Sequence, residues 1–234
     1  MTKHIGLIGG LSPESTVHYY EHLCREFNRI QGGLQFPEIT LRSLNLQGLI
    51  DLFDADDWDG VAAVLLDSLD RLKAAGADFA AILANTPHNA YERIRETSPL
   101  KIVTIMDATT EALADDRKRR VALLGTRPTM EHGFFQNHFQ SQGVEALTPT
   151  TSQRRELDRI IWDELSHGEV NPESLDAVIE MIDDLVNAGA EAIVLGCTEL
   201  CMLVAEGDSP CAIYDTTKLH ATAILRYALN DRVG

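Results

Sequence analysis

Two stretches of the chain match each other without a gap: AGADFAAILANT at Ala75–Thr86 and AGAEAIVLGCTE at Ala188–Glu199. A weaker match pairs His4–Gly10 with Arg120–Thr126 at nearly the same separation along the chain. Each stretch has the pattern of a short apolar strand followed by a turn. An internal repeat of this kind predicts that the chain is built from two similar structural units.

The repeat also predicts the domain boundaries. We expect one half over residues 1–115, with a C-terminal helix over 216–234 packing back onto it, and a second half over residues 116–215. No linker rich in proline, serine or glycine divides the chain.

Short apolar runs alternate with longer amphipathic stretches along the whole sequence, which predicts parallel sheets flanked by helices, an α/β fold. The expected strands are His4–Gly9, Glu38–Leu44, Phe79–Ala84, Lys101–Ile105, Arg120–Leu124, Ala192–Gly196 and Ala212–Tyr214. The expected helices are Ser15–Ile30, Asp59–Ala75, His88–Glu96, Ala108–Ala114, Thr129–Gln140, Gln153–His167, Pro172–Ala188 and Thr216–Leu229.

Ligands of such sheets bind at the carboxyl ends of the strands. If the two halves face each other, four turns at strand ends line one cleft between them: Gly9–Ser12, Ala84–Thr86, Gly125–Arg127 and Gly196–Glu199. The expected active site therefore lies between the halves.

Composition excludes several classes of function. The chain has 234 residues and a net charge of −16, which disfavours binding to nucleic acids and to anionic membranes. No apolar run reaches the roughly 18 residues that a membrane helix needs, and the start of the chain lacks the pattern of a signal peptide. We expect a cytoplasmic protein whose cysteines are free thiols.

The turns at the strand ends offer hydroxyl groups next to helix starts. Ser12, Thr86 and Thr198 each stand where a helix begins, and free backbone N–H groups at such positions attract carboxylates. A small carboxylate ligand fits this pattern. The same residues are also common helix caps, and a cap needs no ligand.

Cys197 follows a glycine at the end of an apolar strand, where a helix start would stabilise a thiolate able to act as a base. A free cysteine is also a common small packing residue, and position alone leaves both roles open. Cys24, Cys201 and Cys211 are interpreted as packing residues.

No cofactor or metal site is predicted. The run Gly6–Gly10 matches neither the dinucleotide fingerprint nor the P-loop, and no lysine ends a strand where a pyridoxal Schiff base would be expected. His18 and His22 are four residues apart but lack a third ligand. His88, in the first turn of an expected helix, is a candidate proton donor.

Taken in order, four motifs resemble those of the aspartate/glutamate racemase family of cofactor-independent amino-acid racemases. They are GLIGGLSPEST at Gly6–Thr16, ANTPH at Ala84–His88, ALLGTRPTM at Ala122–Met130 and GCTE at Gly196–Glu199. The resemblance spans almost the whole chain. It implies two pseudo-symmetric α/β domains with the active site between them, a homodimer, and two cysteines that exchange the α-proton on opposite faces of an amino acid.

The resemblance also implies roles for individual residues. Cys197 matches the second catalytic cysteine of the family. Other positions match groups that hold the carboxylate and amino groups of the substrate, and we include Glu199 with them: Ser12, Asn85, Thr86, Thr126 and Thr198.

Two departures from the family pattern stand out. The first catalytic cysteine is replaced by Ala84, and the internal repeat independently pairs Ala84 with Cys197. Thr86, His88 or a bound water would have to replace the missing acid. Members that act on acidic amino acids often carry a lysine where this chain has Glu156, and a glutamate there would disfavour a second carboxylate on the substrate.

Three functions are compatible with these motifs. The first is an amino-acid racemase with an atypical acid. The second is a single-cysteine enzyme like the arylmalonate decarboxylase of the same superfamily, in which carbon dioxide leaves one face and a proton arrives at the other. The third is a protein that binds an amino acid or carboxylate without turning it over.

Overall fold

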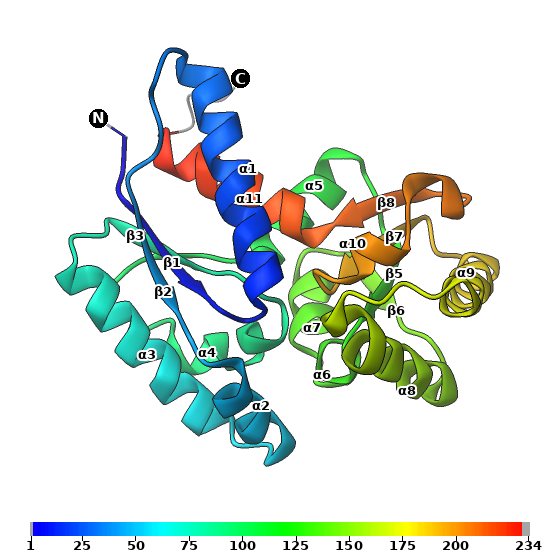
Figure 1. Cartoon of the computed structure of the whole chain (residues 1–234). Helices are drawn as coiled ribbons and strands as arrows, with labels where there is room; N and C mark the ends of the chain where they lie inside the picture. Colours follow the sequence, from blue (N-terminus) through cyan, green and yellow to red (C-terminus); the bar gives the residue numbers. More distant parts are fainter. Residues whose placement is uncertain (1, 231–234) are drawn as a thin grey trace. The chain divides into compact units, whose positions relative to one another are not determined.

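A computed structural model describes residues 2–230 as an α/β protein with two compact units. The first unit contains residues up to Ile105 and those from Thr217 on, and the second contains Met106–Thr216. The boundary falls at the start of α5, one helix before the boundary expected at residues 115 and 116. Both units are shown in Figure 1.

The first unit holds a parallel four-stranded sheet of order β2-β1-β3-β4. Its elements are β1 (Ile5–Gly9), α1 (Pro13–Gln31), β2 (Ile39–Ser43), α2 (Leu46–Asp54), α3 (Trp58–Ala74), β3 (Phe79–Ile82), the 3₁₀ turn η1 (Thr86–Ala90), α4 (Tyr91–Ile94), β4 (Ile102–Val103) and α11 (Thr216–Ala228).

Alternate residues of β1 and β3 face opposite sides of this sheet, as the two-residue period of a strand requires. Leu7 and Ala81 belong to a core with α1 and α11, whereas Ile8 and Ile82 belong to a core with α3 and α4. The chain's last helix therefore completes the first unit, to which α1 also belongs (Figure 1).

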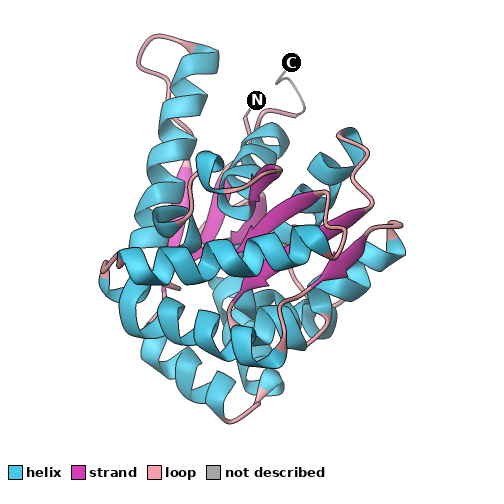
Figure 2. Ribbon diagram, turned by 90° about the vertical axis from the view of Figure 1, so that its right-hand side faces the viewer, coloured by secondary structure: helices cyan, strands magenta, loops and turns pink. Residues whose placement is uncertain are grey.

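The second unit repeats this topology with a parallel sheet of order β6-β5-β7-β8. Its elements are α5 (Ile105–Asp115), β5 (Arg120–Gly125), α6 (Arg127–Glu131), α7 (Phe134–Ser141), β6 (Glu145–Leu147), α8 (Thr151–Arg159), a π-helical turn η2 (Ile160–Glu164), η3 (Leu165–His167), α9 (Pro172–Asn187), β7 (Ala192–Gly196), α10 (Leu200–Leu203), η4 (Glu206–Asp208) and β8 (Ala212–Asp215). In both units the sheets are flanked by helices (Figure 2). This confirms the predicted fold class of two similar α/β halves.

Several predicted elements differ from the observed ones. The helix expected over Thr129–Gln140 is two helices, α6 and α7, because Gly133 between them has a left-handed φ of +81°. The helix expected over Gln153–His167 changes to π and then 3₁₀ geometry after Arg159. The prediction also missed α2 and the three-residue edge strand β6. The part of the C-terminal helix expected over 231–234 lies outside the described residues.

Among the described residues, no helix is both long and apolar enough to cross a membrane.

Candidate active site

In the first unit, the turn after β1 positions Ser12 at the start of α1. Gly10 adopts a φ of +78°, and a Cβ atom there would lie 2.4 Å from the backbone oxygen of Leu44, so only glycine fits. The hydroxyl of buried Ser12 accepts a hydrogen bond from the backbone N–H of Ser15 at 3.3 Å. Ser12 is therefore a helix cap in this structure, whatever else it binds.

The turn after β3 lies directly beside the turn after β1. The two strands pair up to Ile8 and Ile82, and the backbone N–H of Leu83 then donates to the carbonyl of Ile8 at 2.9 Å. The next residues, Ala84, Asn85 and Thr86, are all buried.

The side-chain amide of Asn85 is the unusual group of this turn. The residue is 4% exposed, and among residues 2–230 neither its Nδ2 nor its Oδ1 has a hydrogen-bond partner. Leaving a buried polar group unpaired costs about 1–3 kcal/mol. An amide offers donors and an acceptor, so it suits a ligand that carries both an amino group and a carboxylate.

His88 is buried and its ring nitrogens are both engaged. Nδ1 lies 2.8 Å from the carbonyl oxygen of Ala84, and Nε2 accepts from the backbone N–H of Ile105 at 3.3 Å. A carbonyl can only accept, so Nδ1 carries the proton. His88 therefore connects η1 by hydrogen bonds to Ala84 in the turn after β3 and to Ile105, which follows β4. To donate a proton to a substrate, the ring would have to break a bond that holds this turn.

In the second unit, the turns after β5 and β7 are neighbours because Gly125 pairs with Gly196 at the strand ends. A Cβ on Gly125 would lie 2.8 Å from the carbonyl oxygen of Gly196, so this close approach needs glycine. Thr126 is buried, and its hydroxyl lies 3.1 Å from that of Thr129. The two turns bring Thr126 and Cys197 to the same edge of the sheet.

Cys197 is 6% exposed, and its Sγ donates a hydrogen bond to Oε2 of Glu199 at 3.0 Å. The Thr198 hydroxyl donates to the same oxygen at 2.6 Å. Burial, followed by the negative charge of Glu199 and its hydrogen bond, raises the pKa of the Cys197 thiol well above its ordinary value of 9.0. The thiol is therefore protonated at neutral pH.

The expectation that a helix start would activate this thiol is wrong. The helix after the turn, α10, begins only at Leu200 and has four residues, and burial together with the Glu199 carboxylate raises the pKa of the thiol where activation would lower it. Glu199 is thus a partner of Cys197 as well as a candidate substrate ligand, a role that the motif alone did not reveal.

Glu156 lies on α8, and its carboxylate pairs with Arg159 at 2.7 Å. The hydrogen bond from Arg159 holds the pKa of Glu156 below its usual range. Because this charge already has a counter-ion, the repulsion that Glu156 was expected to exert on a second substrate carboxylate is reduced.

The two units place Ala84 and Cys197 at equivalent positions, each at the end of the third strand of its repeat. The structure brings Ser12 together with Ala84–Thr86 in one unit, and Thr126 together with Cys197–Glu199 in the other. Among the described residues there is no group of three or more His, Cys, Asp or Glu side chains that could hold a metal ion.

The sequence-family model of the Asp/Glu/hydantoin racemases matches residues 8–224 of the chain, which include all of these turns. The chain belongs to this family. A candidate Asp/Glu racemase from Yersinia pestis is 36% identical to it, with a TM-score of 0.91 over 97% of this chain and 99% of the other. An aspartate racemase homologue from Pyrococcus horikoshii OT3 is 30% identical, with a TM-score of 0.83 over 97% and 99% of the two chains.

A third relative has a name that states an activity. The chain is 26% identical over 149 residues to a broad specificity amino-acid racemase of Bacillus subtilis (strain 168). The match covers 61% of this chain and 63% of that relative, so it spans less than two thirds of the relative's length.

Proposed function

We propose that the protein is a cofactor-independent amino-acid racemase, an isomerase that moves the α-proton of a small amino acid by way of Cys197. The observation that carries this proposal is the buried Cys197 thiol, which donates to the carboxylate of Glu199 at 3.0 Å. The pair provides a proton donor and a proton acceptor within one turn. Family membership and the name of the Bacillus relative support the same chemistry.

Proton transfer in this proposal starts from the neutral thiol. Glu199 accepts the proton of Cys197, and the thiolate then takes the α-proton of the substrate. The reverse sequence delivers a proton to the substrate from the same side. The raised pKa of Cys197 makes the thiolate a strong base once it has formed, although little of it is present at rest.

Substrate binding is assigned to the polar groups of the same turns. Asn85 binds the amino acid through its unpaired amide, and hydroxyls help to hold the carboxylate: Ser12, Thr86, Thr126 and Thr198. Inversion also needs a donor for the other face of the α-carbon, and Ala84 cannot supply a proton. We assign this role to Thr86 or to a water that it holds. His88 serves as a positioning residue because both of its nitrogens are engaged.

One observation favours a second function. Ala84 occupies the position equivalent to Cys197 in the other unit. Of these two equivalent positions, only that of Cys197 therefore carries a thiol. A decarboxylase needs only one such thiol, because carbon dioxide leaves from one face and a proton arrives at the other. We also propose that the protein is cytoplasmic and forms a homodimer.

The test is proton exchange in deuterated water with a panel of L-amino acids, followed by mass spectrometry and chiral chromatography. A racemase exchanges the α-proton and inverts the product, and Cys197→Ala should abolish both. Cys211→Ala, just before β8, is the matched control and should retain them. Release of carbon dioxide from disubstituted malonates without exchange of amino acids would support the decarboxylase instead. Full exchange by Cys197→Ala would disprove the role of this thiol.

A further inference from the structure

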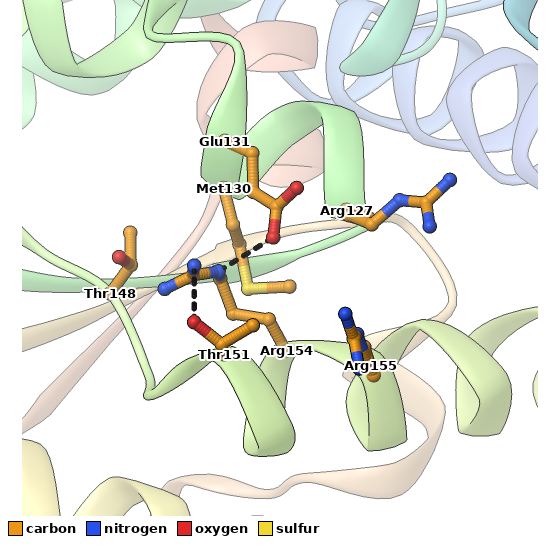
Figure 3. Close-up of a pocket in the computed structure, with 7 residues that line it drawn as sticks. All are labelled: Arg127, Met130, Glu131, Thr148, Thr151, Arg154 and Arg155. Atoms are coloured by element: carbon orange, nitrogen blue, oxygen red, sulfur yellow. Dashed lines mark hydrogen bonds and ion pairs between the residues drawn. The ribbon is translucent and has the colours of Figure 1, made fainter.

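An open pocket of about 590 Å³ lies in the second unit, beside the turn that follows β5. Its walls come from α6, from α8 and from the segment before α8 (Figure 3). Three arginines line it, Arg127, Arg154 and Arg155, together with a single carboxylate, that of Glu131. Such a concentration of positive charge is unexpected in a chain with a net charge of −16.

Arg154 is held in place by three hydrogen bonds. Its Nε donates to Glu131 at 2.8 Å, its Nη1 to the carbonyl oxygen of Pro149 at 2.6 Å, and its Nη2 to the hydroxyl of Thr151 at 3.2 Å. The side chain is 21% exposed. This guanidinium is therefore a fixed part of the pocket wall. It forms an ion pair with Glu131, the only carboxylate among the residues that line the pocket.

Arg127 and Arg155 differ from Arg154 in this respect. In the part of the chain that the structure describes, neither guanidinium makes an ion pair or a side-chain hydrogen bond. Figure 3 shows them on the same side of the pocket, Arg127 from the start of α6 and Arg155 from α8. Asp158 interacts with Arg127 through its Oδ1, which accepts from the backbone N–H of Arg127 at 2.7 Å, and through its charge, but it forms no ion pair with the guanidinium.

Two unpaired guanidiniums that face one cavity repel each other, and an anion between them removes this cost. A guanidinium presents paired N–H donors that match the two oxygens of a carboxylate or phosphate. Thr148 adds a hydroxyl, and Met130 adds an apolar surface to the pocket. The pocket thus has the donors for an oxyanion and room for a small molecule that carries one.

We propose that this pocket binds a small oxyanion, a carboxylate or a phosphate group, between Arg127 and Arg155. The site is separate in its residues from the Cys197 turn, although Arg127 directly follows Thr126 at the same edge of the sheet. Binding of the anion therefore does not depend on the proposed racemase activity.

The experiment is isothermal titration calorimetry of the full chain at low ionic strength with inorganic phosphate, sulfate and malonate. The double variant Arg127→Gln/Arg155→Gln should weaken binding at least about tenfold, because two charge-assisted contacts are lost. Arg119→Gln/Arg117→Gln is the matched control. It removes the same charge just before β5, at the opposite end of the strand from the pocket, and should leave the affinity unchanged.

The outcomes separate the ligands and the two proposals. Tighter binding of malonate than of phosphate would identify an organic dicarboxylate as the natural ligand type, and the reverse order would identify a phosphate group. Cys197→Ala should bind the anion as the wild type does, even though it lacks activity. Absence of binding by the wild type, or equal losses in the two double variants, would overturn the proposal.

Discussion

At the scale of single residues, the chemistry depends on what surrounds one thiol. Cys197 and Ala84 occupy equivalent places in the two repeats, but only Cys197 has a carboxylate as its hydrogen-bond partner. The sequence located the thiol correctly at a strand end. The sequence predicted a lowered pKa for this thiol, which is wrong, because the shift depends on burial and on the Glu199 side chain, whose carboxylate accepts the hydrogen bond of the thiol.

The Glu199 charge should therefore control the titration of Cys197. We expect Glu199→Gln to lower the pKa of the thiol, since it removes the negative charge and the acceptor that disfavour the thiolate. Burial should still keep the pKa above 9.0, the ordinary value of the group. Thiolate absorbance against pH, with Cys197→Ser subtracted to remove the other cysteines, measures the change. A rise in the pKa would contradict the assigned role of Glu199.

A substitution at Ala84 should increase the rate at which the proposed racemase inverts its substrate. Ala84→Cys would place a second thiol at the repeat-equivalent position, and general acid–base groups contribute about 10²–10⁴-fold to a rate. We expect a clear increase in the rate of inversion relative to the rate of α-proton exchange. Ala84→Ser is the control of similar size, and chiral chromatography in deuterated water gives both rates. Unchanged inversion in Ala84→Cys would show that the wild type already has an adequate second donor.

At the scale of secondary structure, the sequence predicted the buried central strands best. The strand predicted at Ala192–Gly196 has the observed bounds, because it is a continuous apolar run enclosed by polar residues. The edge strand β6 was missed since it has only three residues, one exposed and two half-buried, which carry no such signal. The site was predicted as a set of turns, whereas the unpaired amide of Asn85 and the pocket arginines depend on packing that no local pattern encodes.

The change from α8 to π geometry is stabilised by one buried carboxylate. Glu164 accepts hydrogen bonds from Ser174 at 2.6 Å and from Asn171 at 2.9 Å, and it pairs with Arg159 at 2.7 Å. These contacts connect η2 to the start of α9. The bonds from Ser174 and Asn171, followed by that from Arg159, lower the pKa of Glu164 below its ordinary value of 4.5.

We expect Glu164→Gln to destabilise the protein by about 2 kcal/mol at neutral pH, because charged hydrogen bonds are each worth about 1.5–3 kcal/mol. A folded-state pKa below the unfolded value gives stability that is complete above pH 4.5 and is lost as the pH falls further. The difference between variant and wild type in urea unfolding should therefore shrink at acidic pH. Glu180→Gln, on the exposed side of α9, is the control and should have little effect at either pH.

At the scale of the whole molecule, the chain crosses from one repeat to the other and back. The first unit is completed only when α11 packs against β1 and β3 through residues such as Ile224 and Leu225, more than a hundred positions later in the sequence. The second unit has its own core, in which Leu185 of α9 packs with the residues of β5 and β7. The residues of each unit thus form apolar cores of their own, two in the first unit and one in the second, as expected for domains.

This division predicts where a core substitution loosens the chain. Leu225→Ala and Leu185→Ala each remove a buried leucine side chain, 3% and 5% exposed, and should each cost about 2–5 kcal/mol. In hydrogen–deuterium exchange, Leu225→Ala should reduce the protection of β1, β3 and α1 most, although α11 is remote from them in sequence. Leu185→Ala should instead reduce that of β5 and β7. If both variants reduced the protection of all strands equally, the two units would unfold as one cooperative unit. The prediction that each unit unfolds separately would then be wrong.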